Sequence, residues 1–388
     1  MLRDKSSSRS PRPVSLLVTT LLFVSPLRAA EPVRVWNTRD ARTFEAALAA
    51  ADGLRATFQI PGKAPVVTPL SSLAADDTNR IRKWRENWRH PLIVPEAIAP
   101  WPAQAIAPAG ELKSTAEGGG VFVYESANFR ITSDLRIPDG AATDIARVFE
   151  ATRSALIAMP LGLHAGGETE RYRVSMFGDG TAYGAAGGVG GSGGYYDGRT
   201  RRMLVLLPNL GITENNGIVR LDYAKNIFIL KHEVTHQLIS RWHGRIPMWA
   251  YEGIAEFVAA LPYAQGTYTF QNTGPAFRDY LLKWRKTRDS RSIRFIPPAT
   301  LMSMTGADWK DAVGRGEAYD LYNSSSLLIY YFIQQQGGAP LAAYLDALRR
   351  GEDEGVAEKT HLLRGKSRES LEAELTALAK KLGVELTR

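Results

Sequence analysis

The stretch between His232 and Glu256 constrains the fold more than any other part of the sequence. It reads HEVTHQLISRWHGRIPMWAYEGIAE and holds three of the six histidines of the 388-residue chain. His232 and His236 lie four apart, a spacing that puts both side chains on one face of a helix. Glu252 and Glu256 repeat this spacing after a turn that contains Pro247. The segment therefore predicts two successive helices, each with a pair of polar side chains on one face.

The spacing of these residues points to a metal ion. Two imidazoles one helical turn apart can converge on one ion, and Glu233 then points toward a water molecule as a general base. A catalytic zinc site takes a third protein ligand and leaves a fourth position for water. The chain has no cysteine, so this ligand must be a histidine, glutamate or aspartate. We expect His243 to be a loop residue, whereas Glu252 on the second helix can face the histidines. Asp222 is expected to cap the first helix.

HEVTH followed by WAYEGIAEF resembles the gluzincin metallopeptidases, and most of all their peptidase-MA-like group, over roughly residues 121–350. The resemblance implies an α+β fold: a zincin-like domain with a small N-terminal sheet and a mainly helical C-terminal part. It implies that Zn²⁺ is bound by His232, His236 and Glu252. It also implies that Glu233 is the general base for peptide-bond hydrolysis by a zinc-activated water. Glu256 is similar to the carboxylate that orients a ligand histidine in thermolysin-like enzymes, so we expect it to orient His232.

A hydroxyl donor for the oxyanion is also expected. The segment YNSSSLLIYYFIQQQGG, which begins at Tyr322, resembles a helix of related zinc aminopeptidases that begins Y-E-K-G and whose tyrosine has this role. Tyr322 is the favoured donor, although residues 323–325 depart from that motif. Tyr319 is the first alternative, followed by Tyr195 and Tyr196. The G-x-M-E-N signature that holds the amino end of a substrate is absent, which favours endopeptidase action.

A glycine-rich segment between residues 187 and 194 matches a second pattern. Gly188, Gly190 and Gly193 have the dinucleotide-binding spacing, which needs a strand before it and a helix that opens within it. The turn-forming GGYYDG and then a strand follow instead, so a flexible loop beside the active site is the better interpretation. The strand Met203–Leu207 is expected to be the sheet edge that pairs with an extended peptide.

The N-terminal third predicts three parts. Residues 1–30 read as a signal peptide, because a basic start precedes an apolar stretch too short for a bilayer, which needs ~20 residues. Export to the periplasm or the extracellular space follows, with no membrane span after removal of the signal, and an uncleaved anchor is the alternative. Residues 31–84, with Trp36, Phe44 and Trp84, resemble a small SH3-like β-barrel that would bind another protein. A plain small β-domain is the alternative.

The rest of the chain is expected to be a linker and one catalytic domain. Five prolines between residues 91 and 108 and the run AEGGG predict a linker over 85–120. Residues 121–388 then form the zincin-like peptidase domain, with a helix from Ala141 to Met159.

Charge bears on the partners. The net charge is +8, and residues 1–30 contribute five basic residues and one acidic residue, which leaves +4 without them. No element carries a basic stripe, so a peptide or protein substrate is expected and nucleic acid is not. Two functional alternatives stay open: a non-catalytic binding protein on a peptidase scaffold, and a zinc hydrolase that acts on a non-peptide bond.

Overall fold

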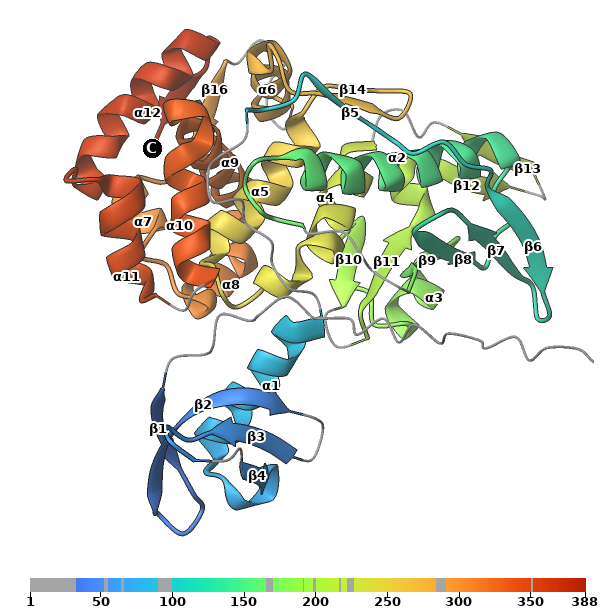
Figure 1. Ribbon diagram of the computed structural model, residues 1–388. Coiled ribbons are helices and arrows are strands. Elements are labelled where there is room, and N and C mark those ends of the chain that lie inside the picture. Colours follow the sequence, from blue (N-terminus) through green and yellow to red (C-terminus); the bar gives the residue numbers. More distant parts are fainter. Residues whose placement is uncertain are drawn as a thin grey trace, which may run out of the picture. The chain divides into compact units, whose positions relative to one another are not determined.

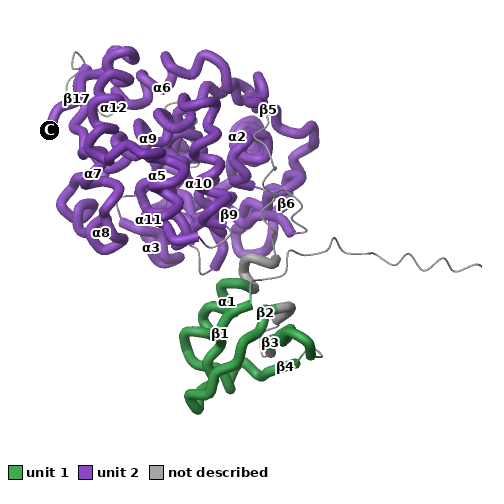
Figure 2. The backbone as a smooth tube through the Cα atoms, turned by 60° about the vertical axis from the view of Figure 1, so that its left-hand side comes forward, with its two compact units in different colours: residues 1–85 green, residues 86–388 purple. Residues whose placement is uncertain are grey.

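The computed structural model describes residues 33–388 apart from 52–54, 64–65, 90–99, 165–169, 191, 198–199, 216–217, 222–226, 284–290 and 350–351. The expected signal peptide and the expected helix cap Asp222 lie outside the described residues. The chain divides into two compact units, residues 1–85 and 86–388 (Figure 2). Among the described helices, none combines the length and the apolar character that a membrane crossing requires.

The first unit is a four-stranded antiparallel meander followed by a helix. Its strands pair in sequence order, and Trp36 and Phe58 are buried at its centre with their rings 4.8 Å apart. Asp77, in the first turn of the helix, accepts a hydrogen bond of 2.7 Å from the backbone N–H of Asn37. The elements are β1 (Arg34–Asn37), β2 (Thr43–Ala51), β3 (Arg55–Gln59), β4 (Val66–Pro69), η1 (Leu70–Ser72) and α1 (Ala75–Arg89).

The SH3-like barrel expected for this unit is not closed in the described residues. β1 pairs only with β2, and β4 pairs only with β3, so the sheet has two open ends. A single bridge between Thr38 and Leu73 connects the end of β1 to the segment after β4. Closure of a barrel needs a continuous ladder between its first and last strands, and this unit is therefore an open sheet.

The second unit is mixed α and β and begins with a six-stranded sheet in the order β10-β11-β9-β8-β7-β6. Strands β8, β9 and β11 run parallel, and the other neighbours are antiparallel. The parallel strands are connected through α2 (Asp139–Ala158) and α3 (Gly180–Ala185), and α2 confirms the helix expected from Ala141. The strands are β6 (Lys113–Glu117), β7 (Val121–Glu125), β8 (Phe129–Ser133), β9 (Tyr172–Phe177), β10 (Gly194–Asp197) and β11 (Arg202–Leu206).

The prediction that Met203–Leu207 forms the edge of the sheet is wrong by one strand. The Met203–Leu207 segment is β11, which pairs with β9 on one side and with β10 on the other. The edge is β10, where Tyr195 pairs with Leu204 and Tyr196 with Met203. The GGYYDG segment was expected to be a turn, but aromatic residues favour strands and these two tyrosines extend the sheet.

Part of the expected linker belongs to the second unit. Within 85–120, β6 lies at the other sheet edge, and β5 (Gln104–Ile106) pairs with β15 (Thr267–Thr269). The Trp101 indole N–H donates to the carbonyl of Gly337 at 2.6 Å, and its ring lies 5.5 Å from that of Phe270. Residues 90–99 lie outside the described part of the chain, and the prediction of a linker stays untested for them.

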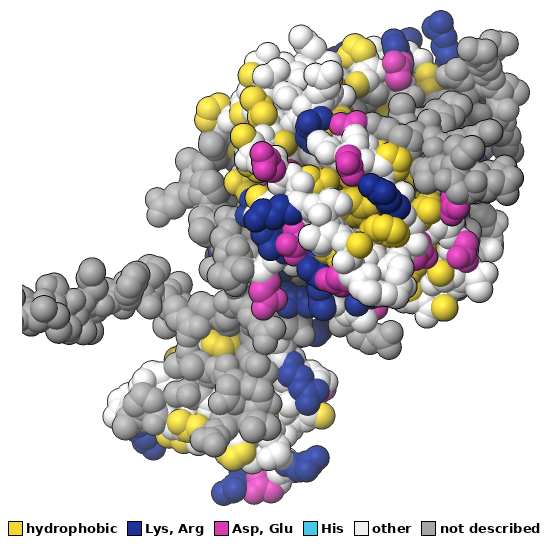
Figure 3. All heavy atoms as spheres, turned by 90° about the vertical axis from the view of Figure 1, so that its right-hand side faces the viewer, with side chains coloured by type: hydrophobic (Ala, Val, Ile, Leu, Met, Phe, Trp, Pro, Cys, Tyr) yellow, Lys and Arg dark blue, Asp and Glu magenta, His cyan; other side chains and the backbone are white. Residues whose placement is uncertain are grey.

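The face in Figure 3 shows acidic and basic side chains interspersed rather than separated by sign. Two ion pairs join strands of the sheet: Arg130 on β8 contacts Glu125 on β7 at 2.9 Å and Glu117 on β6 at 2.5 Å. Every residue of β6 is exposed, so it buries little apolar area against the sheet. Backbone pairing with β7 and these charges therefore hold this edge strand.

Helices form the rest of the second unit, with the sheet on one side of Figure 1 and helices α7 to α12 on the other. Between them lie α4 (Ile227–Leu238) and α5 (Met248–Ala260). The remaining helices are η2 (Leu207–Leu210), η4 (Ser240–Trp242), α6 (Gly274–Leu281), α7 (Pro298–Leu301), α8 (Gly306–Gly314), α9 (Ala318–Gln334), η5 (Gln335–Gly338), α10 (Ala339–Arg349), α11 (Glu354–Ala357), η6 (Glu358–Leu363) and α12 (Arg368–Leu382). Short strands are β12 (Ile212–Asn215), β13 (Ile218–Leu221), β14 (Tyr263–Ala264), β16 (Ser292–Arg294) and β17 (Glu385–Thr387).

Helix α5 is the centre of this unit. Every residue after Met248 in it is buried, as expected for a helix that is covered on all sides. Gly253 lets α9 approach closely, since a Cβ at this position would lie 2.6 Å from the Ser325 carbonyl oxygen and 2.8 Å from Cγ1 of Ile329. The glycine that follows Glu252 therefore serves helix packing, and it holds the Glu252 backbone against α9.

Candidate metal centre

Helix α4 carries the two histidines of the candidate site. Leu230, Val234 and Leu238 anchor it in the core, and the two histidines project one turn apart from the opposite face of the helix. Their Nε2 atoms lie 3.0 Å from each other. Lys231 ties this helix to the next, because its Nζ donates a 2.7 Å hydrogen bond to the carbonyl of Leu261 at the end of α5.

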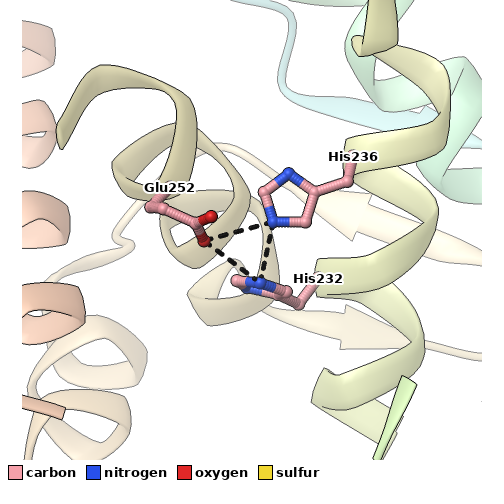
Figure 4. A group of neighbouring side chains, drawn as sticks. All are labelled: His232, His236 and Glu252. Atoms are coloured by element: carbon pink, nitrogen blue, oxygen red, sulfur yellow. Dashed lines mark hydrogen bonds and ion pairs between the residues drawn. The ribbon is translucent and has the colours of Figure 1, made fainter. Parts of the chain in front are cut away.

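Helix α5 brings the third side chain. After α4 the chain turns through η4 and through Gly244, whose positive φ of 72° suits a glycine. The helix then begins after Pro247 and places Glu252 opposite the histidines (Figure 4). Glu252 Oε2 lies 3.2 Å from Nε2 of His236 and 3.5 Å from Nε2 of His232. The sequence prediction that these three residues come from two facing helices is therefore met by the structure.

The three atoms fit a single metal ion. A tetrahedral ion with bonds of ~2.0–2.1 Å keeps its ligand atoms ~3.3 Å apart. The observed separations of 3.0, 3.2 and 3.5 Å lie around this value. All three side chains are buried or half-buried. His232, His236 and Glu252 thus form a group that could hold a metal ion.

Glu256 lies one turn after Glu252 and contacts the other nitrogen of His232. Its Oε1 is 3.0 Å from Nδ1 of His232, which places Nε2 toward the group described above. Burial by itself would lower the pKa of His232, but the negative charges of Glu256, Glu233 and Glu252 outweigh it and raise that pKa to about 10. A proton and a metal ion therefore compete for the same nitrogen.

Two carboxylates near the histidines, those of Glu233 and Glu252, have pKa values shifted in opposite directions. Burial raises the pKa of Glu233 above its ordinary value, although His232 and His236 oppose this shift. Burial also opposes ionisation of Glu252, but the interactions with His236 and His232 outweigh it and lower its pKa. Glu252 is thus the better anionic ligand, and Glu233 is the carboxylate better able to carry a proton.

Glu233 is in contact with the edge strand β10. A Cβ added to Gly194 would lie 2.6 Å from Cγ of Glu233 and 3.1 Å from its Cδ. Only glycine allows the strand to come this close to α4. Gly193, the last glycine of the rejected dinucleotide pattern, is similarly close to Ile229. The glycines that precede the two tyrosines therefore bring the sheet edge against the proposed base.

Of the expected oxyanion donors, Tyr322 lies at the site and Tyr319 does not share its environment. The ring of Tyr322, on α9, is 6.0 Å from that of His232 and half-buried. Burial and the neighbouring carboxylates, Glu252 first among them, raise the pKa of Tyr322, so its hydroxyl keeps its proton. Tyr319, one turn earlier, is 51% exposed.

Two further residues near the ligands had no clear sequence signal. Tyr251 stacks on the imidazole of His236, with ring centroids 4.6 Å apart, and packs edge-on against His243 with centroids 5.3 Å apart. His243 follows η4, in the loop position expected for it, and lies outside the ligand group. The hydroxyl of Tyr280 contacts Glu256 from α6. Both tyrosines depend on packing between helices, which the spacing of residues along the chain does not show.

A scan against models of known protein families finds no match to this chain, and a search of curated proteins finds no similar sequence. The function of the site is therefore argued from its residues and their arrangement. The site combines three converging ligand atoms, the adjacent carboxylate of Glu233 and the ring of Tyr322.

Proposed function

We propose that this chain is a zinc-dependent metallopeptidase with a zincin-like fold, of the gluzincin type that its motifs resemble. The observation that carries the proposal is the convergence of His232, His236 and Glu252 from two helices, with Glu233 beside them on the first helix. A metal-binding group alone would fit many functions. The adjacent carboxylate with a raised pKa adds the proton-transfer group that hydrolysis needs.

Zinc is the metal that suits this set of donors. Two imidazoles and one carboxylate are one of the ligand sets found in catalytic zinc sites, and the chain offers no thiolate. When bound, a zinc ion would supply Lewis-acid chemistry at this position. Glu256 would favour the tautomer of His232 that presents Nε2, since its Oε1 lies 3.0 Å from Nδ1.

The chain's own residues then account for the proton transfers. Glu233 takes a proton from the attacking water as the water oxygen bonds to the carbonyl carbon. It passes this proton to the amine nitrogen as the carbon–nitrogen bond breaks, so the products are a carboxylic acid and an amine. The hydroxyl of Tyr322 donates a hydrogen bond to the developing oxyanion. Its raised pKa keeps it a donor throughout.

The edge strand β10 favours a peptide as the substrate. It pairs only with β11 among the described residues, so one side of its backbone faces away from the sheet. An extended peptide can add to such an edge as a further strand. Gly194 at the start of β10 touches Glu233, so a peptide on this edge would pass beside the base.

The test is Glu233→Gln in the chain without residues 1–30. We expect about one zinc per chain in parent and variant, and a loss of at least ~100-fold in kcat on peptides identified by a library screen. Equal activity of the two proteins would refute the mechanism. Zinc binding with no cleavage of any peptide would favour the non-catalytic binding protein, and cleavage of esters or amides outside peptides would favour the other hydrolase.

A further inference from the structure

The carboxylate of Glu256 has a partner on each of its two oxygens. Oε1 lies 3.0 Å from Nδ1 of His232, and Oε2 accepts a hydrogen bond of 2.5 Å from the hydroxyl of Tyr280 on α6. Glu256 is 7% exposed and Tyr280 is 9% exposed, so solvent has little access to either group. We propose that Tyr280 is a positioning residue of the metal centre, which acts through Glu256 on the imidazole of His232; this inference rests on the proposed function.

The hydrogen bond from Tyr280 is what fixes the plane of the carboxylate. A carboxylate anchored through one oxygen can still rotate about its terminal torsion, which is broad. A tyrosine hydroxyl on the other oxygen removes this freedom, and hydrogen bonds to ionised acceptors are stronger than neutral ones. Because the imidazole of His232 follows the carboxylate that it contacts, the direction of Nε2 depends on Tyr280.

Tyr280 is itself held against the helix that carries the histidines. Its ring packs edge-on against Phe228 of α4, with centroids 6.1 Å apart. Phe228 lies one helical turn before His232, so α6 touches α4 beside the ligand. Burial and the charge of Glu256 hold the pKa of Tyr280 far above its usual range, so the hydroxyl remains the donor.

The other ligand histidine is oriented by different means. Nδ1 of His236 is buried and contacts no carboxylate among the described residues, whereas Nδ1 of His232 lies 3.0 Å from Oε1 of Glu256. Its ring instead stacks on Tyr251, with an interplanar angle of 25°. The contacts from Tyr280 through Glu256 therefore reach His232 alone. A substitution of Tyr280 or Glu256 should alter the geometry at this one ligand only.

The test compares Tyr280→Phe with Tyr331→Phe. Both variants remove the hydroxyl of a buried tyrosine that donates to a glutamate, but Tyr331 contacts Glu374 on α12, away from the ligand group. Zn²⁺ affinity is measured by competition with a chromophoric chelator, and the Co²⁺-substituted proteins are compared by visible absorption. Tyr280→Phe should weaken Zn²⁺ binding ~10-fold or more and change the Co²⁺ spectrum, as loss of a partner behind a metal ligand does. Tyr331→Phe should leave both unchanged.

A double-mutant cycle shows whether Tyr280 acts through Glu256. In the Glu256→Ala background, Tyr280→Phe should change Zn²⁺ affinity by no more than about twofold, because residues in one hydrogen-bond network are not additive. Equal effects of Tyr280→Phe in both backgrounds would overturn the proposal. So would a lowered melting temperature in Tyr280→Phe with unchanged Zn²⁺ affinity, which would mark a structural role only.

The same measurements separate this inference from the proposed function. A parent chain that binds neither Zn²⁺ nor Co²⁺ would overturn the metal centre and the role of Tyr280 together. A parent chain that binds metal, with an unaltered affinity and spectrum in Tyr280→Phe, would overturn the role of Tyr280 and leave the metal centre in place.

Discussion

Gly194→Ala tests how the edge strand positions the proposed base. The added Cβ would lie 2.6 Å from Cγ of Glu233 and 3.1 Å from its Cδ. Carbon atoms pack at ~3.5–4.0 Å, so β10 or the Glu233 side chain must move by about 1 Å. A misplacement of this size at a catalytic group costs ~100-fold in rate. The ligand atoms lie on other side chains, so metal binding should persist.

Three measurements decide the outcome for Gly194→Ala: kcat on a cleaved peptide, zinc content by atomic absorption, and the melting temperature. The control is Gly190→Ala in the same glycine-rich segment, where an added Cβ would meet no atom within 4 Å. We expect kcat to fall ~100-fold in Gly194→Ala alone, with about one zinc retained in both proteins. Equal kcat values in the two variants would refute the idea that β10 holds Glu233 in place.

Three further predictions concern the donor, the metal and the boundary of the second unit. Tyr322→Phe should lower kcat ~100- to 1000-fold at a stability cost of ~1 kcal/mol or less, and Tyr319→Phe should be nearly silent; the reverse result would move the donor by one turn. The pKa of His232 is raised to about 10 in the metal-free chain, so zinc displaces a proton from this residue when it binds. The apparent zinc affinity should therefore rise ~10-fold per pH unit between pH 6 and pH 9, and an affinity independent of pH would contradict this. In that metal-free chain the protonated imidazole stabilises the fold, and this contribution is lost as the pH rises toward 10. A fragment that starts near residue 100 should fold and bind zinc. A fragment that starts near residue 110 should have a lower melting temperature, because it lacks β5 and the Trp101 contact with Gly337. Equal melting temperatures of the two fragments would show that residues 100–110 do not stabilise the fold.

Local patterns in the sequence were sufficient for several elements. The spacing of His232 and His236 predicted one helical face, and α4 contains both. The segment NFRITSDL alternates as a strand does, and β8 buries Phe129 and Ile131 on one side. These features depend on a repeat of two or 3.6 residues, which is set by backbone geometry and can be read within a single segment.

The sequence by itself determined which residue types are available near the candidate site and how they are spaced along each helix. Which residues meet across helices was decided only by tertiary packing. Gly253 touches Ser325 of α9, Gly194 touches Glu233, and Tyr280 reaches Glu256 from a separate helix. The open first sheet and the interior place of β11 likewise depend on which strands pair. Such contacts join segments far apart in the chain, and they are chosen by the burial and shape of the whole core, for which no local pattern is a signal.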